Sequence, residues 1–172
     1  SIHNYFFAKA LDQVRPGGVV AFVTSRYTMD SKNSDARRHL AQRAELLGAI
    51  RLPNDAFKKN AGTEVVSDII FLQKRDHPID IVPDWVHLNR TDAGHTMNSY
   101  FVEHPEMILG ETVEESTAYG IDITVRPIEG AELSDLLKEA VSHIEGIYQA
   151  VELPEAEKGK EAETIPATPD VK

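Results

Sequence analysis

The sequence predicts an α/β fold in which helices flank a small sheet, and three observations carry this prediction. Apolar residues recur at helical spacing over residues 2–14, and an uninterrupted apolar run at 19–23 follows after an Arg-Pro-Gly-Gly turn. Two further apolar runs cover residues 46–52 and 65–74, and the connection between them holds no plausible crossover helix. Because parallel neighbours need such a crossover, we expect the last two strands to form an antiparallel pair.

The first elements indicate the second half of a strand–helix–strand crossover. The helix over 2–14, the turn at Gly17 and Gly18 and the strand over 19–23 follow in the expected order, whereas no strand precedes the helix. We therefore expect this chain to be a fragment of a larger protein. The run 19–23 has no polar interruption, which is typical of a strand buried on both faces.

A short helix is expected between the first two strands. Asp35 can cap a helix over 36–45, in which Leu40 and Ala44 share one face. Pro53 then ends the second strand, because proline cannot donate a hydrogen bond to a neighbouring strand.

The pattern changes after residue 76, and we expect a small α+β extension there. Residues 79–88 predict a short strand pair or an irregular strand broken at Pro83. Residues 98–109 predict short helical pieces, and the alternation over 119–125 predicts a strand.

An amphipathic helix over 133–150, with Ser134 as a possible N-cap, ends the extension. From Pro154 onward the sequence has hardly any large apolar residue, so we expect a disordered acidic tail. The expected division is an α/β domain over 1–76, an extension over 77–153 and a tail over 154–172.

Charge is distributed unevenly along the chain. Residues 1–76 carry 12 basic and 8 acidic residues, a net charge of +4, while the remainder carries 6 basic and 20 acidic residues, a net charge of −14. The basic half is compatible with nucleic-acid contact, and the acidic half is explained most simply as solvated surface. The absence of cysteine excludes disulfides and thiolate metal sites. No apolar run is long enough to span a bilayer, so we expect a soluble, cytoplasmic protein.

Familiar catalytic motifs are missing from the sequence. It contains no Gly-x-Ser-x-Gly elbow, no Gly-x-Gly-x-x-Gly fingerprint and no Walker loop. The seven histidines lack the spacing of a metal site, and we expect no metal.

Two places can form a binding site. Thr24, Ser25 and Arg26 lie at the carboxyl end of the first strand, which is where ligands bind in open α/β sheets. In the loop after Pro53, Phe57 stands beside Lys58 and Lys59. An exposed aromatic ring can stack on a base while neighbouring cations hold phosphates. The alternative is that Phe57 packs back onto the core and the lysines are ordinary surface residues.

Taken together, these segments resemble the carboxyl-terminal half of an adenine-N6-specific DNA methyltransferase catalytic domain, as in large prokaryotic methylase–helicase proteins. The resemblance covers about residues 1–150. The stretches that carry it are His3–Leu11, Arg15–Ser25, Leu47–Pro53, Ala56–Lys74, Asn98–Phe101 and His104–Gly110.

The resemblance implies a partial Rossmann-like methyltransferase sheet that ends in an antiparallel strand pair. It implies S-adenosylmethionine as the cofactor of an intact parent and DNA as its substrate, and it allows for a fused helicase. The family's catalytic Asn-Pro-Pro-aromatic loop and its cofactor loop are not in this sequence, so the fragment is expected to bind no cofactor and to hold no catalytic residue.

The resemblance also assigns roles to the candidate site. Phe57 would stack on the flipped-out target base, because an extruded base needs a partner for its lost stacking. Arg26, Lys58 and Lys59 would contact DNA phosphates, and Thr24 and Ser25 would line the cleft.

Two classes of function stay open at this point. The chain is either an inactive fragment that supplies the DNA side of a methyltransferase active site, or a non-catalytic, methyltransferase-like module that binds DNA or a partner protein. A third class, half of a dehydrogenase, is weakened by the antiparallel last strand.

Overall fold

A three-stranded sheet forms the centre of the molecule. The computed structural model describes residues 2–57 and 65–156, with side chains described for 5–57 and 65–145. The strands are β1 (Val19–Ser25), β2 (Ala44–Arg51) and β3 (Ser67–Lys74), in the order β1-β3-β2. β3 is antiparallel to both neighbours, which confirms the antiparallel pair predicted for the last two strands.

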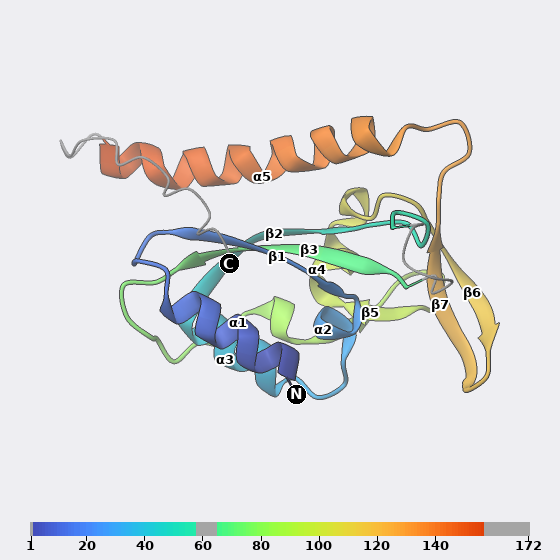
Figure 1. Cartoon of the computed structure of the whole chain (residues 1–172), viewed down its shortest axis with the longest axis horizontal. Helices are drawn as coiled ribbons and strands as arrows, with labels where there is room; N and C mark the ends of the chain where they lie inside the picture. The colour runs from blue at the N-terminus through green and yellow to red at the C-terminus, as the bar shows by residue number, and fades with distance from the viewer. Residues whose placement is uncertain (1, 58–64, 157–172) are drawn as a thin grey trace.

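Helices cover the two faces of this sheet (Figure 1). α1 (Ile2–Asp12) and α3 (Asp35–Arg43) lie against one face, and α5 (Leu133–Ala156) lies across the other. The ring of Phe7 on α1 packs 4.8 Å from the ring of Phe22 on β1. On the opposite face Gly48 leaves room for α5, because a Cβ atom at that position would stand 2.8 Å from the side chain of Ile144.

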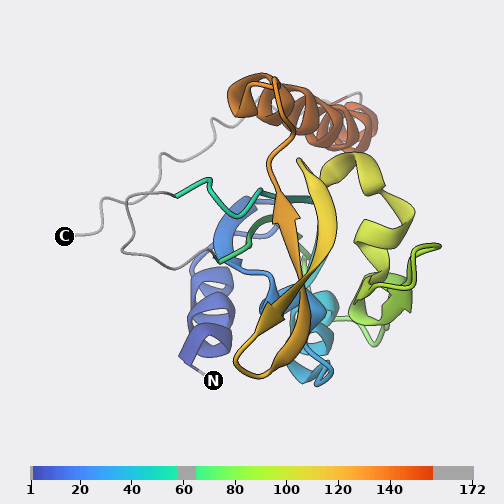
Figure 2. The same cartoon turned by 90° about the vertical axis from the view of Figure 1, so that its right-hand side faces the viewer.

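The second half of the chain adds short elements to one end of the sheet. They are η1 (Asp84–Val86), β4 (Leu88–Arg90), β5 (Thr96–Asn98), α4 (Ser99–Glu103) and η2 (Pro105–Met107). Trp85, Phe101 and Ile144 belong to the same hydrophobic core as Leu40 and Ile50, so residues on both sides of position 76 share one core. A hairpin of β6 (Glu111–Thr117) and β7 (Gly120–Arg126) projects from this end (Figures 1 and 2).

The structure corrects the prediction that β1 is buried on both faces. β1 is an edge strand of the sheet in the described part of the chain, and its exposure alternates. Val19 and Val23 are 40% and 60% exposed, because α5 lies against β2 and leaves that face of β1 open. The mixed α/β class stands, but small antiparallel sheets are what the chain forms, and a Rossmann-like arrangement is not shown.

Other differences lie at element boundaries. The helix expected over 36–45 ends at Arg43, and Ala44 already begins β2. The strand β6 was not predicted, because glutamates interrupt the apolar pattern of residues 111–117. The last helix runs to Ala156 rather than 150, and residues 157–172, most of the expected tail, lie outside the described residues. In the described ranges, no helix is long and apolar enough to cross a lipid bilayer.

Candidate functional site

Four strand ends meet at one end of the sheet, where β1 and β2 finish and β3 begins. The backbone N–H of Arg26, just after β1, donates to the carbonyl oxygen of Val66 at 3.0 Å. The N–H of Leu52, just after β2, donates to the carbonyl oxygen of Ser67 at 2.9 Å. The N–H of Asn54 then donates to the carbonyl oxygen of Val125 on β7 at 2.8 Å. The carboxyl ends of β1 and β2, the start of β3 and the hairpin are therefore joined in one place.

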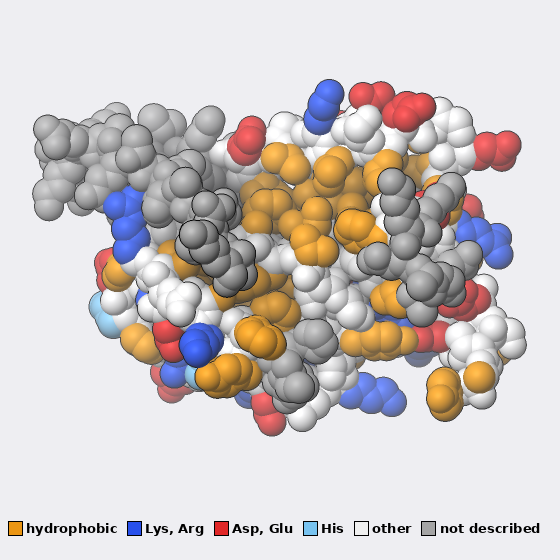
Figure 3. Space-filling view, viewed as in Figure 1, with side chains coloured by type: hydrophobic (Ala, Val, Ile, Leu, Met, Phe, Trp, Pro, Cys, Tyr) orange, Lys and Arg blue, Asp and Glu red, His pale blue; other side chains and the backbone are white. Residues whose placement is uncertain are grey.

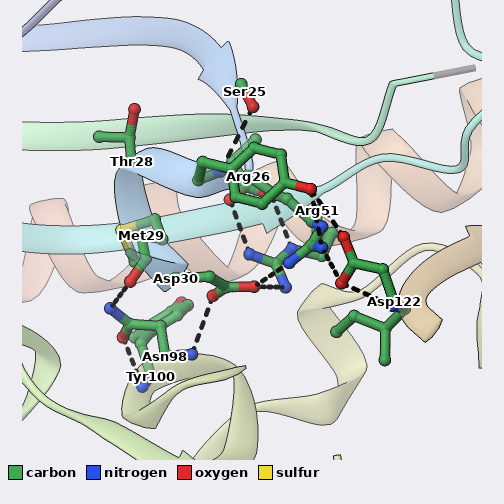
Figure 4. Close-up of polar contacts among 12 residues, drawn as sticks. Ser25, Arg26, Thr28, Met29, Asp30, Arg51, Asn98, Tyr100 and Asp122 are labelled. Atoms are coloured by element: carbon green, nitrogen blue, oxygen red, sulfur yellow. Dashed lines mark hydrogen bonds and ion pairs between the residues drawn. The ribbon is translucent and has the colours of Figure 1, made fainter. Parts of the chain in front are cut away.

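Five charged side chains form a network at this end of the sheet, and we call it the sheet-end network (Figure 4). Its members are Arg26, Asp30, Arg51, Asp68 and Asp122. Arg51 donates through Nε and Nη2 to both carboxylate oxygens of Asp68, each at 2.9 Å, and through Nη1 to Oδ2 of Asp30 at 2.9 Å. Its guanidinium also stacks on the ring of Phe101 at 4.3 Å.

The second arginine extends the network to the hairpin. Arg26 donates to Oδ2 of Asp30 at 3.1 Å and to Oδ1 of Asp122 on β7 at 2.6 Å. The other oxygen of Asp30 accepts the backbone N–H of Asn98 at 2.9 Å. Asp30 therefore joins both arginines to β5, and Arg26 joins the sheet to the hairpin.

Local sequence explains how these charges come together. Arg51 and Asp68 are direct partners in the register of β2 and β3, so their side chains leave the same face of the sheet. Arg26 precedes the short helix α2 (Tyr27–Asp30), whose single turn brings Asp30 beneath the Arg26 side chain at a spacing of four residues.

Because these charges are buried, each of them is stable only while its partner of opposite charge is present. The side chains of Arg51 and Asp68 are 1% and 0% exposed. Burial alone would lower the pKa of Arg51, but the charges and hydrogen bonds of Asp68 and Asp30 raise that pKa above its usual value. The guanidinium therefore keeps its charge, and each buried carboxylate has a cationic partner. Since every charged group in the network is paired with another, we interpret the network as structural rather than as an acid–base pair.

Tyr27 packs against two members of the sheet-end network, Arg26 and Asp122. Its hydroxyl donates to Oδ2 of Asp122 at 2.7 Å, and its ring covers the guanidinium of Arg26 at 4.4 Å. The hydrogen bond to Asp122, together with partial burial, raises the pKa of Tyr27. The side chain is nevertheless 55% exposed. The result is an aromatic ring that is open to solvent and fixed in orientation.

The structure places the site residues predicted from sequence in different environments. Arg26 is 6% exposed and committed to two carboxylates. Thr24 and Ser25 do lie at the edge, where Thr24 bonds the hydroxyl of Thr28 at 2.8 Å and the Ser25 hydroxyl accepts the N–H of Tyr27 at 3.3 Å. Phe57 is 48% exposed and does not pack fully into the core. Lys58 and Lys59 lie outside the described residues.

Sequence reasoning missed Tyr27 and four members of the network. A signal existed for Arg51 and Asp68, because each is a charged residue directly beside the apolar run of its strand. A charge at such a position needs a partner, and each of the two supplies the other. No comparable signal pointed to Asp122, which is 92 residues after Asp30 in the chain and meets it only through Arg26.

Part of the chain is similar to a known phage protein. No family model matches it. It is similar to the protein named Defense against restriction protein B of Escherichia phage P1, with 34% identity over 79 residues. The matched segment covers 45% of this chain and 3% of the length of the phage protein.

These findings correct the resemblance to adenine-N6 DNA methyltransferases. The curated match is to a protein named for defence against restriction, and no methyltransferase family model matches. The stretches that carried the resemblance, a Gly-Gly turn, an apolar strand and a strand pair, are general features of α/β sheets. The expectations of S-adenosylmethionine and of adenine methylation rested on that resemblance alone.

Proposed function

We propose that this chain is a non-catalytic binding module of a protein that acts against restriction, and that it holds single-stranded DNA at the carboxyl end of its sheet. The observation that carries this proposal is Tyr27, an aromatic side chain that is 55% exposed and yet held in place by Arg26 and Asp122. An apolar ring is exposed at a cost, and fixing its orientation lowers the entropy lost when a ligand stacks on it.

Stacking is the chemistry that such a ring offers. Every base has a flat π-face, so an exposed aromatic side chain binds single-stranded nucleic acid without regard to sequence. Phe57, 48% exposed, follows the same strand end that Asn54 ties to the hairpin, and it offers a second ring. Lys58 and Lys59 follow Phe57 in the sequence and supply cations for phosphates.

Of the two partners that the sequence left open, DNA is favoured over a protein on two grounds. The two exposed rings, Tyr27 and Phe57, belong to residues 1–76, the half of the chain with a net charge of +4, and Asp122 is the network residue that comes from the acidic half. The phage protein is named for defence against restriction, a process directed at DNA. The sheet-end network supports a binding role because its carboxylates are all engaged by arginines and serve to hold the site rigid.

Fluorescence anisotropy with a labelled oligonucleotide of about 20 nucleotides tests the proposal, since single-strand sites of this class span several bases. We expect saturable binding by the full chain. Removing one stacked ring costs about 1–3 kcal/mol, so Phe57→Ala and Tyr27→Leu should each weaken binding by about 5- to 150-fold. Tyr27→Phe keeps the ring over Arg26 but loses the hydrogen bond to Asp122, so it should weaken binding less than Tyr27→Leu does.

Tyr119→Ala is the matched control. Tyr119 is fully exposed at the tip of the hairpin, so its loss removes an exposed ring away from the sheet edge and should leave binding unchanged. Absence of saturable binding would sink the proposal. The proposal would also fail if Phe57→Ala and Tyr27→Leu bound DNA as tightly as the original chain. This result counts when both variants have the same thermal unfolding midpoint as Tyr27→Phe.

A further inference from the structure

The outer edge of β1 has unpaired main-chain groups in the described part of the chain. The N–H of Lys74 donates to the carbonyl oxygen of Gly18, and the N–H of Arg26 donates to that of Val66. In the register of β1 and β3, bonding to β3 therefore falls on Gly18 and every second residue after it. The N–H and C=O groups of Val19, Ala21 and Val23 point the other way, toward the open edge.

Nothing in β1 protects this edge. Natural edge strands carry charges, prolines or bulges that prevent another strand from pairing with them. Residues Val19–Ser25 contain no charge and no proline, and all seven pair with β3 without a bulge. The opposite edge, β2, carries Glu45 and Arg51, has a bulge after Leu46, and is bridged by Ile108.

The surface beside this edge is apolar. Val19 and Val23 are 40% and 60% exposed on β1, and Tyr5 and Phe6 are 62% and 59% exposed on the adjoining α1. Figures 1 and 2 place α1 and β1 on the same side of the molecule. Figure 3 shows hydrophobic side chains gathered over this side, between α1 and α5. Apolar surface concentrated in this way marks an interaction site.

We propose that the open edge of β1 is an interaction surface that takes one further β-strand, uncharged and apolar, from a partner polypeptide. A strand is the partner that fits because it alone offers donors and acceptors at the two-residue repeat of Val19, Ala21 and Val23. It is uncharged because the strand it joins carries no charge to pair with a lysine or a carboxylate.

Amide hydrogen exchange, measured residue by residue by NMR, tests this proposal on the full chain. With β1 at the edge, the amides of Val20 and Phe22 should exchange slowly and those of Ala21 and Val23 quickly. The probe is a synthetic peptide that copies residues 18–25. We expect it to slow exchange at Ala21 and Val23 by at least about tenfold and to leave Phe22 unchanged, because the new bonds form only on the outer edge.

Two controls separate strand pairing from apolar adhesion. The same peptide methylated on its amide nitrogens cannot donate hydrogen bonds and should give no protection. Val23→Lys places a charge on the patch and should abolish protection, whereas Val82→Lys, at a residue 44% exposed outside this surface, should not.

Three results would overturn the proposal. The first is unchanged exchange at Ala21 and Val23 in the presence of the peptide, and the second is equal protection by the methylated peptide. The third is protection of Ala21 and Val23 in the chain alone that grows with its concentration, which would assign the edge to a second copy of this chain.

Discussion

Arg51 is the residue on which the rigidity of the site depends most. Its side chain is 1% exposed and holds Asp68 and Asp30 at the same time. Removing one partner of a buried ion pair leaves an uncompensated charge, whereas replacing the whole set by apolar residues can be neutral.

We therefore expect Arg51→Met to lower the free energy of unfolding by about 3–5 kcal/mol, as measured by urea denaturation. The double variant Arg51→Met with Asp68→Leu should recover part of that loss, because it removes the buried carboxylate as well. Arg38→Met, at an exposed arginine on α3, should cost less than about 1 kcal/mol. Equal losses for Arg51→Met and Arg38→Met would show that the network contributes no stability.

Asp122 links the site to acid pH. Burial alone would raise its pKa, but hydrogen bonds from the Tyr27 hydroxyl and the Ile123 amide, with the charge of Arg26, lower it below 3.8. A lowered pKa means that the folded state prefers the ionised form. Its contribution to stability is therefore present above pH 3.8 and is lost as the pH falls through the lowered pKa.

The thermal midpoint of Asp122→Asn should lie a few degrees below that of the original chain at about pH 7, and the gap should close toward about pH 2. The effect is modest because the Asp122 side chain is 39% exposed. Differential scanning calorimetry across this range measures it, and a gap that stays constant with pH would contradict the role given to Asp122.

At the residue scale, the sequence indicated where to look but not which side chains act. Thr24 and Ser25 were expected at the end of the first strand, and they are the last two residues of β1. Phe57 was expected in the loop after Pro53, and it lies in a turn there. Arg26 was expected to reach DNA, yet its guanidinium lies under Tyr27 between Asp30 and Asp122. Pairing with Asp122 depends on how the hairpin folds back, which local patterns do not report.

At the scale of elements, Gly48 controls how closely α5 approaches the sheet. A Cβ atom there would lie 2.8 Å from Cγ1 of Ile144 and 3.0 Å from the hydroxyl of Tyr100. Both neighbours are packed against the core, so neither moves freely.

Gly48→Ala should lower the free energy of unfolding by about 1–3 kcal/mol, the usual cost of overpacking a well-filled core. The paired variant Gly48→Ala with Ile144→Val removes Cδ1, which would lie 3.2 Å from the added Cβ atom, and should restore part of the loss. Urea denaturation measures both. A stabilised Gly48→Ala, as strand propensity alone would favour, would contradict this account of the helix position.

The elements that sequence predicted best are those with a strong period. The helices over 2–14 and 133–150 and the strands over 46–52 and 65–74 all exist, with shifted ends. The strand β6 escaped notice because Glu111, Glu114 and Glu115 fall on both of its faces and hide the alternation. The edge position of β1 could not be predicted, because an apolar run does not say how many neighbours a strand has.

At the scale of the whole molecule, one core joins the two halves of the chain and the sheet-end network locks the hairpin onto the sheet. This architecture leaves two surfaces exposed, and both carry a proposal. One is the carboxyl end of the sheet with Tyr27, and the other is the open edge of β1. Part of the chain is similar to a phage protein named for defence against restriction, and the binding of DNA is our proposal for this chain.

An NMR titration of the isotope-labelled full chain with single-stranded DNA tests the central claim most directly. We predict chemical-shift changes concentrated at Ser25, Tyr27 and Phe57, with the hairpin tip at Tyr119 unaffected. Absence of shifts at saturating DNA, or shifts confined to the hairpin tip or to the open edge of β1, would contradict the claim that this end of the sheet binds DNA.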